Sequence, residues 1–273
     1  MRRLRGRILL LATAAIAAVA ALPQLAAAAP GDEQSSNWAG WAISDAQTIA
    51  GAPVTGSTTT LSFTSTTATW VQPKVTCATN EPTYSAFWVG LGGLASDSNA
   101  LEQVGTQANC TAAGKAEYYA WYELVPAASV NVSLKIRPGD VITASVNAEP
   151  DGILVQVKNR TRKTNFTKLL PTPANTDFTS AEWIAEAPST CDSRLVRCRA
   201  LPLANFGKVP FTRIAAIANN HPGTVTDSTW TSTAIDLVPD ATGHFSGLGT
   251  SGTATPTAVD AAGRAFQVYF GTS

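Results

Sequence analysis

The sequence contains only two histidines, and neither lies where a catalytic or metal-binding histidine is expected. His221 and His244 both occur in turn-rich segments, and no Cys-x-x-Cys pair accompanies them, so the usual zinc spacings are missing. A serine triad also needs a histidine base, and the Gly-x-Ser-x-Gly motif of many serine hydrolases is absent. This scarcity argues against a zinc enzyme and a serine hydrolase, and we expect no metal site.

Charged residues are also scarce, at 14% of the chain, and the lysines and arginines are scattered. A nucleic-acid-binding surface needs clustered basic residues, so we expect no nucleic acid partner. After the N-terminus, no apolar run approaches the roughly 20 residues that a membrane-spanning helix needs, so we expect no membrane partner there. Nothing in the sequence argues for an obligate protein partner, and a monomer is the default expectation.

The N-terminus has the pattern of a secretory signal peptide. Four arginines lie within the first seven residues, an apolar run extends from Ile8 to about Leu22, and small residues follow at Ala26–Ala28. Removing this segment leaves 15 basic and 19 acidic residues, because the four arginines leave with it. We therefore predict a secreted protein in three parts: a signal peptide over 1–28, a short polar lead over 29–36 and one catalytic domain over 37–273.

Four cysteines in an exported chain suggest two disulfides, and three pairings are formally possible. We favour Cys77–Cys110 and Cys191–Cys198, the second of which closes a short loop. With all four cysteines bridged, a cysteine nucleophile is not expected.

Strand signals run through almost all of the remaining chain, and no segment shows a sustained helical period. Val130, Val132, Leu134 and Ile136 alternate with polar residues, which is the period of a half-buried strand. Gly247–Thr257 is rich in glycine, serine and threonine and is expected to form a long turn. Many short strands with frequent turns predict an all-β protein, a β-sandwich of two large bent antiparallel sheets of the concanavalin-like or jelly-roll-like kind.

One stretch concentrates aromatic residues around a short polar segment. The runs Phe87–Gly90 and Tyr118–Glu123 flank Leu101–Gly105, and such strands can form an aromatic-walled cleft. Glu182 and Glu186 are four residues apart, so a strand would place both side chains on the same face. Candidate carboxylates and cleft tryptophans are Glu102, Glu123, Glu182, Glu186, Trp70, Trp88, Trp121 and Trp183.

Five motifs taken in order resemble the glutamic peptidases, also called eqolisins or the G1 peptidase family. The matching segments are Ser36–Gly40, Trp88–Gly90, Leu101–Gly105, Tyr118–Glu123 and Ala181–Glu186, followed by Pro202–Phe206 and the Cys191–Cys198 spacing. Each motif alone is weak, but the ordered set is specific and covers roughly Asn37 to Phe270.

The resemblance implies a two-sheet sandwich that cleaves peptide bonds of polypeptide substrates at acidic pH without a cofactor. Its dyad would be Gln103, as oxyanion donor, and Glu186, as general base and then acid. Substrate-binding residues are expected among Trp38, Trp88, Trp121, Tyr122 and Glu123.

Three positions depart from the better-known fungal members, which have acidic residues there. This chain has Gly92, Gln107 and Tyr119, so its cleft is expected to be less acidic. Two other functions fit the residues: a jelly-roll glycoside hydrolase using two carboxylates such as Glu123 and Glu186, and a non-catalytic sandwich that binds carbohydrate or peptide.

Overall fold

The computed structural model describes residues 33–45, 60–95, 98–191, 198–239 and 252–271, and every regular element in these ranges is a β-strand. The predicted signal peptide lies outside them. The strands are β1 (Glu33–Ser35), β2 (Trp38–Ser44), β3 (Phe63–Val71), β4 (Thr83–Leu91), β5 (Leu101–Cys110), β6 (Ala116–Val125), β7 (Val130–Val132), β8 (Val141–Glu149), β9 (Gly152–Asn159), β10 (Thr164–Leu170), β11 (Ser180–Glu186), β12 (Ser189–Cys191), β13 (Cys198–Ala200), β14 (Lys208–Ala218), β15 (His221–Gly223), β16 (Thr231–Leu237), β17 (Thr253–Pro256) and β18 (Ala265–Gly271).

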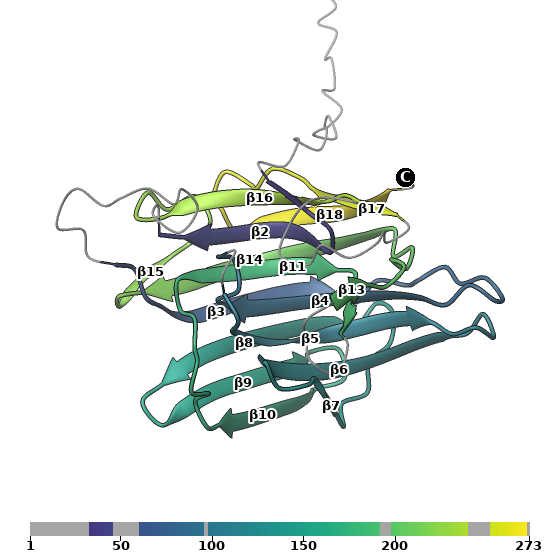
Figure 1. Cartoon of the computed structure of the whole chain (residues 1–273), viewed down its shortest axis with the longest axis horizontal. Helices are drawn as coiled ribbons and strands as arrows, with labels where there is room; N and C mark the ends of the chain where they lie inside the picture. Colours follow the sequence, from purple (N-terminus) through teal and green to yellow (C-terminus); the bar gives the residue numbers. More distant parts are fainter. Residues whose placement is uncertain (1–32, 46–59, 96–97, 192–197, 240–251, 272–273) are drawn as a thin grey trace, which may run out of the picture.

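Sixteen strands form one continuous hydrogen-bonded sheet that folds over on itself. The main path runs β10-β9-β8-β3-β14-β18-β17-β16-β2-β11-β4-β5-β6-β7. Both ends of this path lie at the bottom of Figure 1, and β16 and β17 lie at the top. Strands β3 and β8 pack against β4, β5 and β11, which are distant along the path. The all-β sandwich is confirmed, with its two layers joined through β17 and β16 instead of forming separate sheets.

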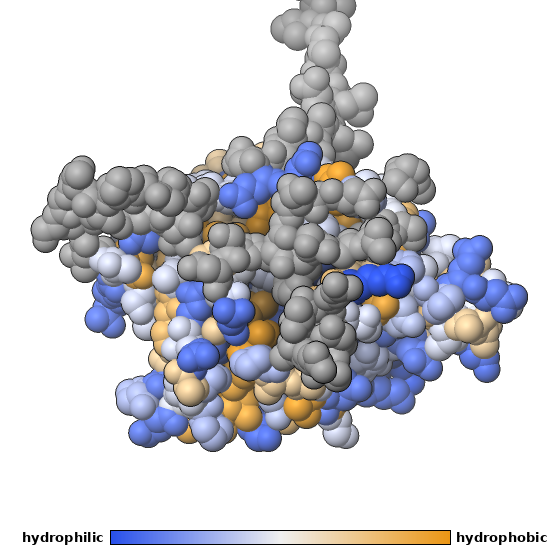
Figure 2. Space-filling view, in the orientation of Figure 1, coloured by the Kyte–Doolittle hydropathy of each residue, from blue (hydrophilic) through white to orange (hydrophobic). Residues whose placement is uncertain are grey.

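The core between the layers follows from the alternation of side chains along the strands. On β8, Ile142, Ala144 and Val146 are buried, and the intervening side chains are partly exposed. Two tryptophans considered for the cleft lie in this core: the indole of Trp70 donates to Thr106 Oγ1, and that of Trp183 donates to the carbonyl of Thr67. The described surface in Figure 2 mixes hydrophilic residues with small, separate hydrophobic areas.

Two segments differ from the expected pattern. The alternation from Val130 to Ile136 forms a strand only over β7, because the amide of Leu134 turns back to donate to the carbonyl of Val132. Leu134 and Ile136 are nevertheless buried in the core. The prediction of a long turn is wrong at Thr253–Pro256, because these residues form β17 and pair with β18.

The predicted disulfide between Cys77 and Cys110 is confirmed, and it closes a separation of 33 residues. Cys198 is disulfide-bonded and stands opposite Cys191 in the β12–β13 pair. The side chain of Cys191 lies outside the described residues, so the second pairing stays a prediction. Strand β1 lies within the expected polar lead and pairs in parallel with β16. The described ranges contain no helix with the length and hydropathy of a bilayer span.

Candidate active site

Strands β2, β11, β4, β5 and β6 are neighbours and share a face directed away from the sandwich core. A second, smaller hydrophobic cluster covers this face and contains Trp38, Trp88, Leu101, Trp121 and Ile184. Successive register partners form a row across it, Ile184, Trp88, Gly105 and Trp121. The sequence motifs that flank Gln103 therefore meet on a single surface, as the strand pattern predicted.

Gly105 allows β4 to approach closely at Phe87 and Trp88 in this row. A Cβ at position 105 would collide with the carbonyl oxygen of Phe87 and lie 2.6 Å from Trp88 Cβ. The ring of Trp88 meets that of Trp38 edge to face, with the centroids 5.1 Å apart. Trp88 is fully buried, so its indole N–H has a fixed direction.

That N–H donates to the carboxyl of Glu186, the last residue of β11. Trp88 Nε1 lies 2.7 Å from Glu186 Oε2, and Asn37 Nδ2 lies 3.2 Å from Oε1. Burial raises the pKa of Glu186 to about 8, with a contribution from the charge of Glu123, while the bonds from Trp88 and Asn37 act in the opposite direction. Glu186 is thus a partly exposed, fixed carboxyl that holds its proton below about pH 8.

Gln103 lies two strands away on β5 and is bonded to Glu123 on β6. Gln103 Nε2 donates to Glu123 Oε2 at 2.8 Å, and Oε1 of the same amide is buried without a hydrogen-bond partner. Burial raises the pKa of Glu123 to about 7, although the bond from Gln103 lowers it. Glu123 therefore links the two predicted dyad residues: it accepts a hydrogen bond from Gln103, and its charge acts on Glu186.

The backbone register by itself places Gln103 in the same cross-strand row as Glu182, the other glutamate of β11. Gln103 stands opposite Gly90, which in turn stands opposite Glu182. Glu182 shares the face of Glu186, as predicted, but it is fully buried, and neither carboxyl oxygen has a hydrogen-bond partner. Burial raises its pKa well above the ordinary value, the nearby Ser180 hydroxyl opposes the shift, and the charges of Asp177 and Glu102 add to it. A carboxyl sealed in this way has no access to water or substrate, which favours Glu186.

The structure brings Trp38, Trp88, Trp121 and Glu123 to this face but not Tyr122. The ring of Tyr122 points to the opposite side of β6, where it stacks on Phe166 and accepts a hydrogen bond from Lys168 Nζ. The alternation along β6 could have shown this, since Tyr122 lies between Trp121 and Glu123.

Asn37 was not among the predicted site residues, although it lies within the first motif, Ser36–Gly40. Of the three departures from fungal members, Gln107 and Tyr119 are register partners in the row that contains Glu186. Neutral side chains therefore occupy the part of the face beside this carboxyl. Within the described ranges, no group of three or more histidine, cysteine, aspartate or glutamate side chains could hold a metal ion.

Comparison with known proteins agrees with the motifs. The model of the peptidase A4 family matches residues 47–254. Scytalido-glutamic peptidase, solved with a peptide-based transition-state analogue, superposes with a TM-score of 0.62 at 21% identity, over 87% of this chain and 98% of that chain. SCP-B, an eqolisin solved with the tripeptide Ala-Ile-His, gives 0.59 at 21% identity, with the same coverage.

Aspergilloglutamic peptidase from Aspergillus niger gives a TM-score of 0.54 at 25% identity, over 69% of this chain and 99% of that chain. No match to a curated protein sequence was found. The structural likenesses confirm the fold, and the family model spans more than half of the chain. The protein therefore belongs to the peptidase A4 family, the glutamic peptidases or eqolisins, which hydrolyse peptide bonds.

Proposed function

We propose that this chain is an exported endopeptidase whose proton-transfer group is Glu186 and whose oxyanion donor is Gln103. The observation that carries the proposal is the arrangement of Glu186: it is partly exposed, bonded through both oxygens and coupled through Glu123 to Gln103. Family membership favours a peptide substrate over the glycosidic bond considered from sequence.

The proposed reaction uses one water and the scissile peptide. The Glu186 carboxylate accepts a proton from water as its oxygen attacks the carbonyl carbon, and the carbonyl electron pair moves to oxygen. An amide nitrogen carries two N–H groups, and Gln103 uses one on Glu123, which leaves the other for the oxyanion. The proton on Glu186 then passes to the departing amine as the C–N bond breaks.

Two buried atoms on the same face suit a peptide ligand. Trp121 Nε1 is a donor and Gln103 Oε1 an acceptor, and neither has a hydrogen-bond partner in the described structure. A buried polar atom without a partner costs about 1–3 kcal/mol. A substrate peptide group offers one carbonyl acceptor and one N–H donor, so an extended peptide can satisfy both atoms once the side chains that cover them in the ligand-free chain move aside.

The raised pKa of Glu186 has a definite consequence for the pH profile. The carboxylate base is the minor form below about pH 8 in the ligand-free chain. If base catalysis starts from this form, kcat/KM rises with pH towards 8. The acidic activity implied by the family resemblance would instead require Glu186 to begin the reaction as an acid. Measuring kcat/KM on a denatured protein substrate from pH 3 to 9 separates these two orders of proton transfer.

The deciding experiment compares Glu186→Gln with Glu182→Gln. Glu186→Gln keeps the shape but cannot accept a proton, so kcat should fall by about 100- to 10,000-fold while the fold survives. Glu182→Gln changes a sealed side chain of the same strand and should retain activity within about threefold, because Glu182 takes no part in the proposed reaction. Gln103→Ala should lower kcat by about 100- to 1000-fold.

If Glu182→Gln lowers kcat strongly and Glu186→Gln does not, the catalytic glutamate is Glu182, which the strand register places in the row of Gln103. If Glu186→Gln and Glu182→Gln are each fully active, neither glutamate is catalytic and the proposed dyad is refuted. Export and a monomeric state are part of the proposal. N-terminal sequencing of secreted protein tests cleavage after residue 28, and analytical ultracentrifugation tests the monomer.

A further inference from the structure

Asn37 lies just before β2 and is 1% exposed, so its polar groups need partners within the protein. Its side-chain nitrogen donates to Glu186 Oε1 at 3.2 Å. Its main-chain carbonyl accepts a hydrogen bond from the amide of Ala187 at 2.8 Å. Asn37 therefore contacts both the carboxyl of Glu186 and the backbone that follows it.

Ser35 fixes which end of the Asn37 amide faces the carboxyl. The hydroxyl of Ser35 accepts hydrogen bonds from the amides of Asn37, at 3.3 Å, and Trp38, at 3.1 Å. A serine hydroxyl has two lone pairs and one hydrogen, so its hydrogen remains for the third neighbour, 3.1 Å away. That neighbour must be an acceptor, which identifies it as Asn37 Oδ1 and turns Nδ2 towards Glu186.

The main chain holds Ser35 in place. Ser35 pairs with Leu237 at the end of the parallel β1–β16 ladder, and its carbonyl accepts a hydrogen bond from Val238 at 2.9 Å. A series of hydrogen bonds thus connects the end of β16 through Ser35 and Asn37 to Glu186. Each link is short and at least partly buried.

A glutamate carboxyl has a broad, roughly two-fold preference about its last torsion, so packing alone does not orient it. Here one oxygen accepts from Trp88 and the other from Asn37, which fixes the plane of the group. Trp88 lies on β4, Asn37 lies in the segment between β1 and β2, and Trp38 makes a further, smaller contribution, so loss of the Trp88 or the Asn37 donor weakens the hold on the plane of the carboxyl.

We propose that Asn37, oriented by Ser35, is a positioning residue that holds the Glu186 carboxyl in its reactive orientation. The effect on catalysis rests on the function proposed above, but the contact itself does not. Removing the Asn37 donor also removes a bond that favours ionised Glu186, so the pKa of Glu186 should rise above its value of about 8.

The test measures two independent quantities in Asn37→Ala and Ser35→Ala. One is the Glu186 titration, followed by carbon NMR of its carboxyl and assigned by the signal that disappears in Glu186→Gln. The other is the separation of kcat from KM on a peptide substrate. Asn159→Ala is the matched control, because Asn159 is also a buried asparagine but donates to Lys135 and Asp140, away from the site.

We expect Asn37→Ala to raise the pKa of Glu186 and to lower kcat by about 10- to 100-fold with KM changed less than about threefold, the usual range for a hydrogen bond to a charged group. Ser35→Ala keeps the donor and should lower kcat by only about threefold. Asn159→Ala should lower the melting temperature without moving the Glu186 titration.

An unchanged Glu186 titration in Asn37→Ala overturns the proposal, even where stability or kcat falls, because Asn37 would then be purely structural. A shifted titration in a chain whose peptidase activity does not depend on Glu186 upholds the positioning contact and refutes the proposed function. Loss of activity in Glu186→Gln with no effect of Asn37→Ala refutes the positioning role and leaves the proposed function standing.

Discussion

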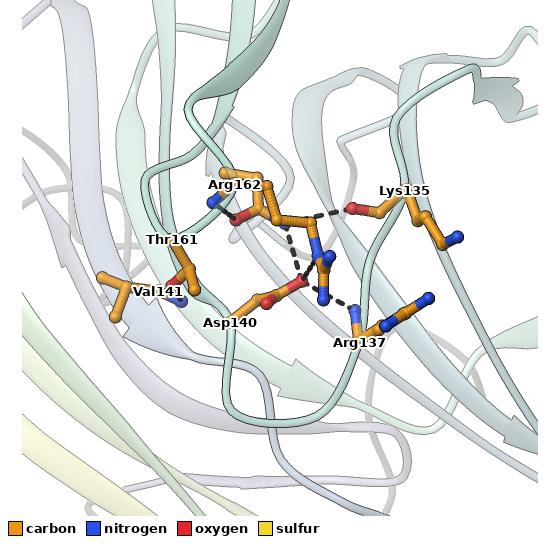
Figure 3. Close-up of polar contacts among 7 residues, drawn as sticks. Lys135, Arg137, Asp140, Val141, Thr161 and Arg162 are labelled. Carbon is orange, nitrogen blue, oxygen red and sulfur yellow. Dashed lines mark hydrogen bonds and ion pairs between the residues drawn. The ribbon is translucent and has the colours of Figure 1, made fainter.

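Two regions of this molecule bury a carboxyl group, and the pKa of that group is lowered in one region and raised in the other. Asp140, in the turn before β8, is 2% exposed and accepts hydrogen bonds from Arg162 Nε and the amide of Arg137 (Figure 3). It accepts a third from Asn159 Nδ2. Burial alone would raise its pKa, but these donors outweigh burial and lower it. Glu102, on β5, is fully buried without a partner for either oxygen, and burial, with the charge of Asp177 adding to it, raises its pKa to about 8.

The difference shows that hydrogen-bond donors, one of them the Arg162 cation, decide the charge state of these buried carboxyls. Asp140 has three donors and is held as an anion, whereas Glu102 and Glu182 have none and are held as neutral acids. Glu186 lies between these limits: hydrogen bonds from Trp88 and Asn37, with a further contribution from Trp38, reduce but do not cancel the effect of burial. An intermediate balance of this kind suits a group that must both release and accept a proton.

Among these substitutions, Glu102→Gln should change the free energy of unfolding most, because it removes a buried carboxyl that accepts no hydrogen bond. The pKa of Glu102 rises from 4.5 to about 8 on folding, so between these pH values the unfolded chain releases a proton that the folded chain keeps. Stability is therefore fully present below about pH 4.5 and falls as pH rises towards 8, by about 4–5 kcal/mol for this group.

Urea unfolding of Glu102→Gln at pH 5 and pH 8 measures this effect. The variant should resemble the parent at pH 5 and be more stable than the parent at pH 8. Glu117→Gln, at an exposed position of β6, is the control and should leave the pH dependence unchanged. If Glu102→Gln loses stability equally with rising pH, Glu102 is not the neutral acid described here.

Asp140→Ala should destabilise the fold by about 3 kcal/mol at neutral pH, because it removes one of the two acceptors of the buried Asn159 amide, the side-chain acceptor of the Arg137 amide and the partner of the Arg162 cation. The pKa of Asp140 is lowered, so its contribution is present above the ordinary value and is lost as pH falls through the folded value. Denaturant unfolding at pH 7 and pH 2.5 should show the difference between variant and parent shrinking in acid. Asp151→Ala, in the exposed β8–β9 turn, should cost less than about 0.5 kcal/mol; an equal cost would refute the role given to Asp140.

Trp88→Phe tests Glu186, the carboxyl with an intermediate supply of donors, and should give the smallest effect of these substitutions. Phenylalanine keeps an aromatic ring but removes the N–H that donates to Glu186 Oε2. We expect the pKa of Glu186 to rise and kcat to fall by about tenfold. Trp183→Phe removes an equivalent N–H that donates to Thr67 in the core, and activity per folded molecule should not change. Equal losses in both variants would mean that Trp88 acts only through packing.

Local pattern predicts most of the strands and the meeting of the aromatic motifs on one face. The cysteine count predicts two disulfides but leaves three pairings open, of which the favoured Cys77–Cys110 is confirmed. The sequence did not predict the position of Tyr122, for which motif membership outweighed the alternation along β6. It also gave no sign that Asp140 collects donors or that Glu102 lacks them. The donors to Asp140 are close in sequence, but they meet it through the geometry of the turn before β8 and of the loop after β9, and composition or periodicity carries no information about that geometry.

The position of β2 in the sheet has a consequence for how the chain folds. β2 begins at Trp38, yet its two neighbours are β11 and β16, which end at Glu186 and Leu237. Neither ladder of β2 can therefore form before the chain has been synthesised as far as Glu186, and the ladder with β16 requires the chain as far as Leu237. Such high contact order predicts slow folding, since long loops must close before their contacts stabilise the structure. The hydrogen bond from Asn37 reaches the last residue of β11, so the carboxyl that would cleave peptides takes its final orientation only after the segment before β2 has met β11 across about 150 residues of intervening chain.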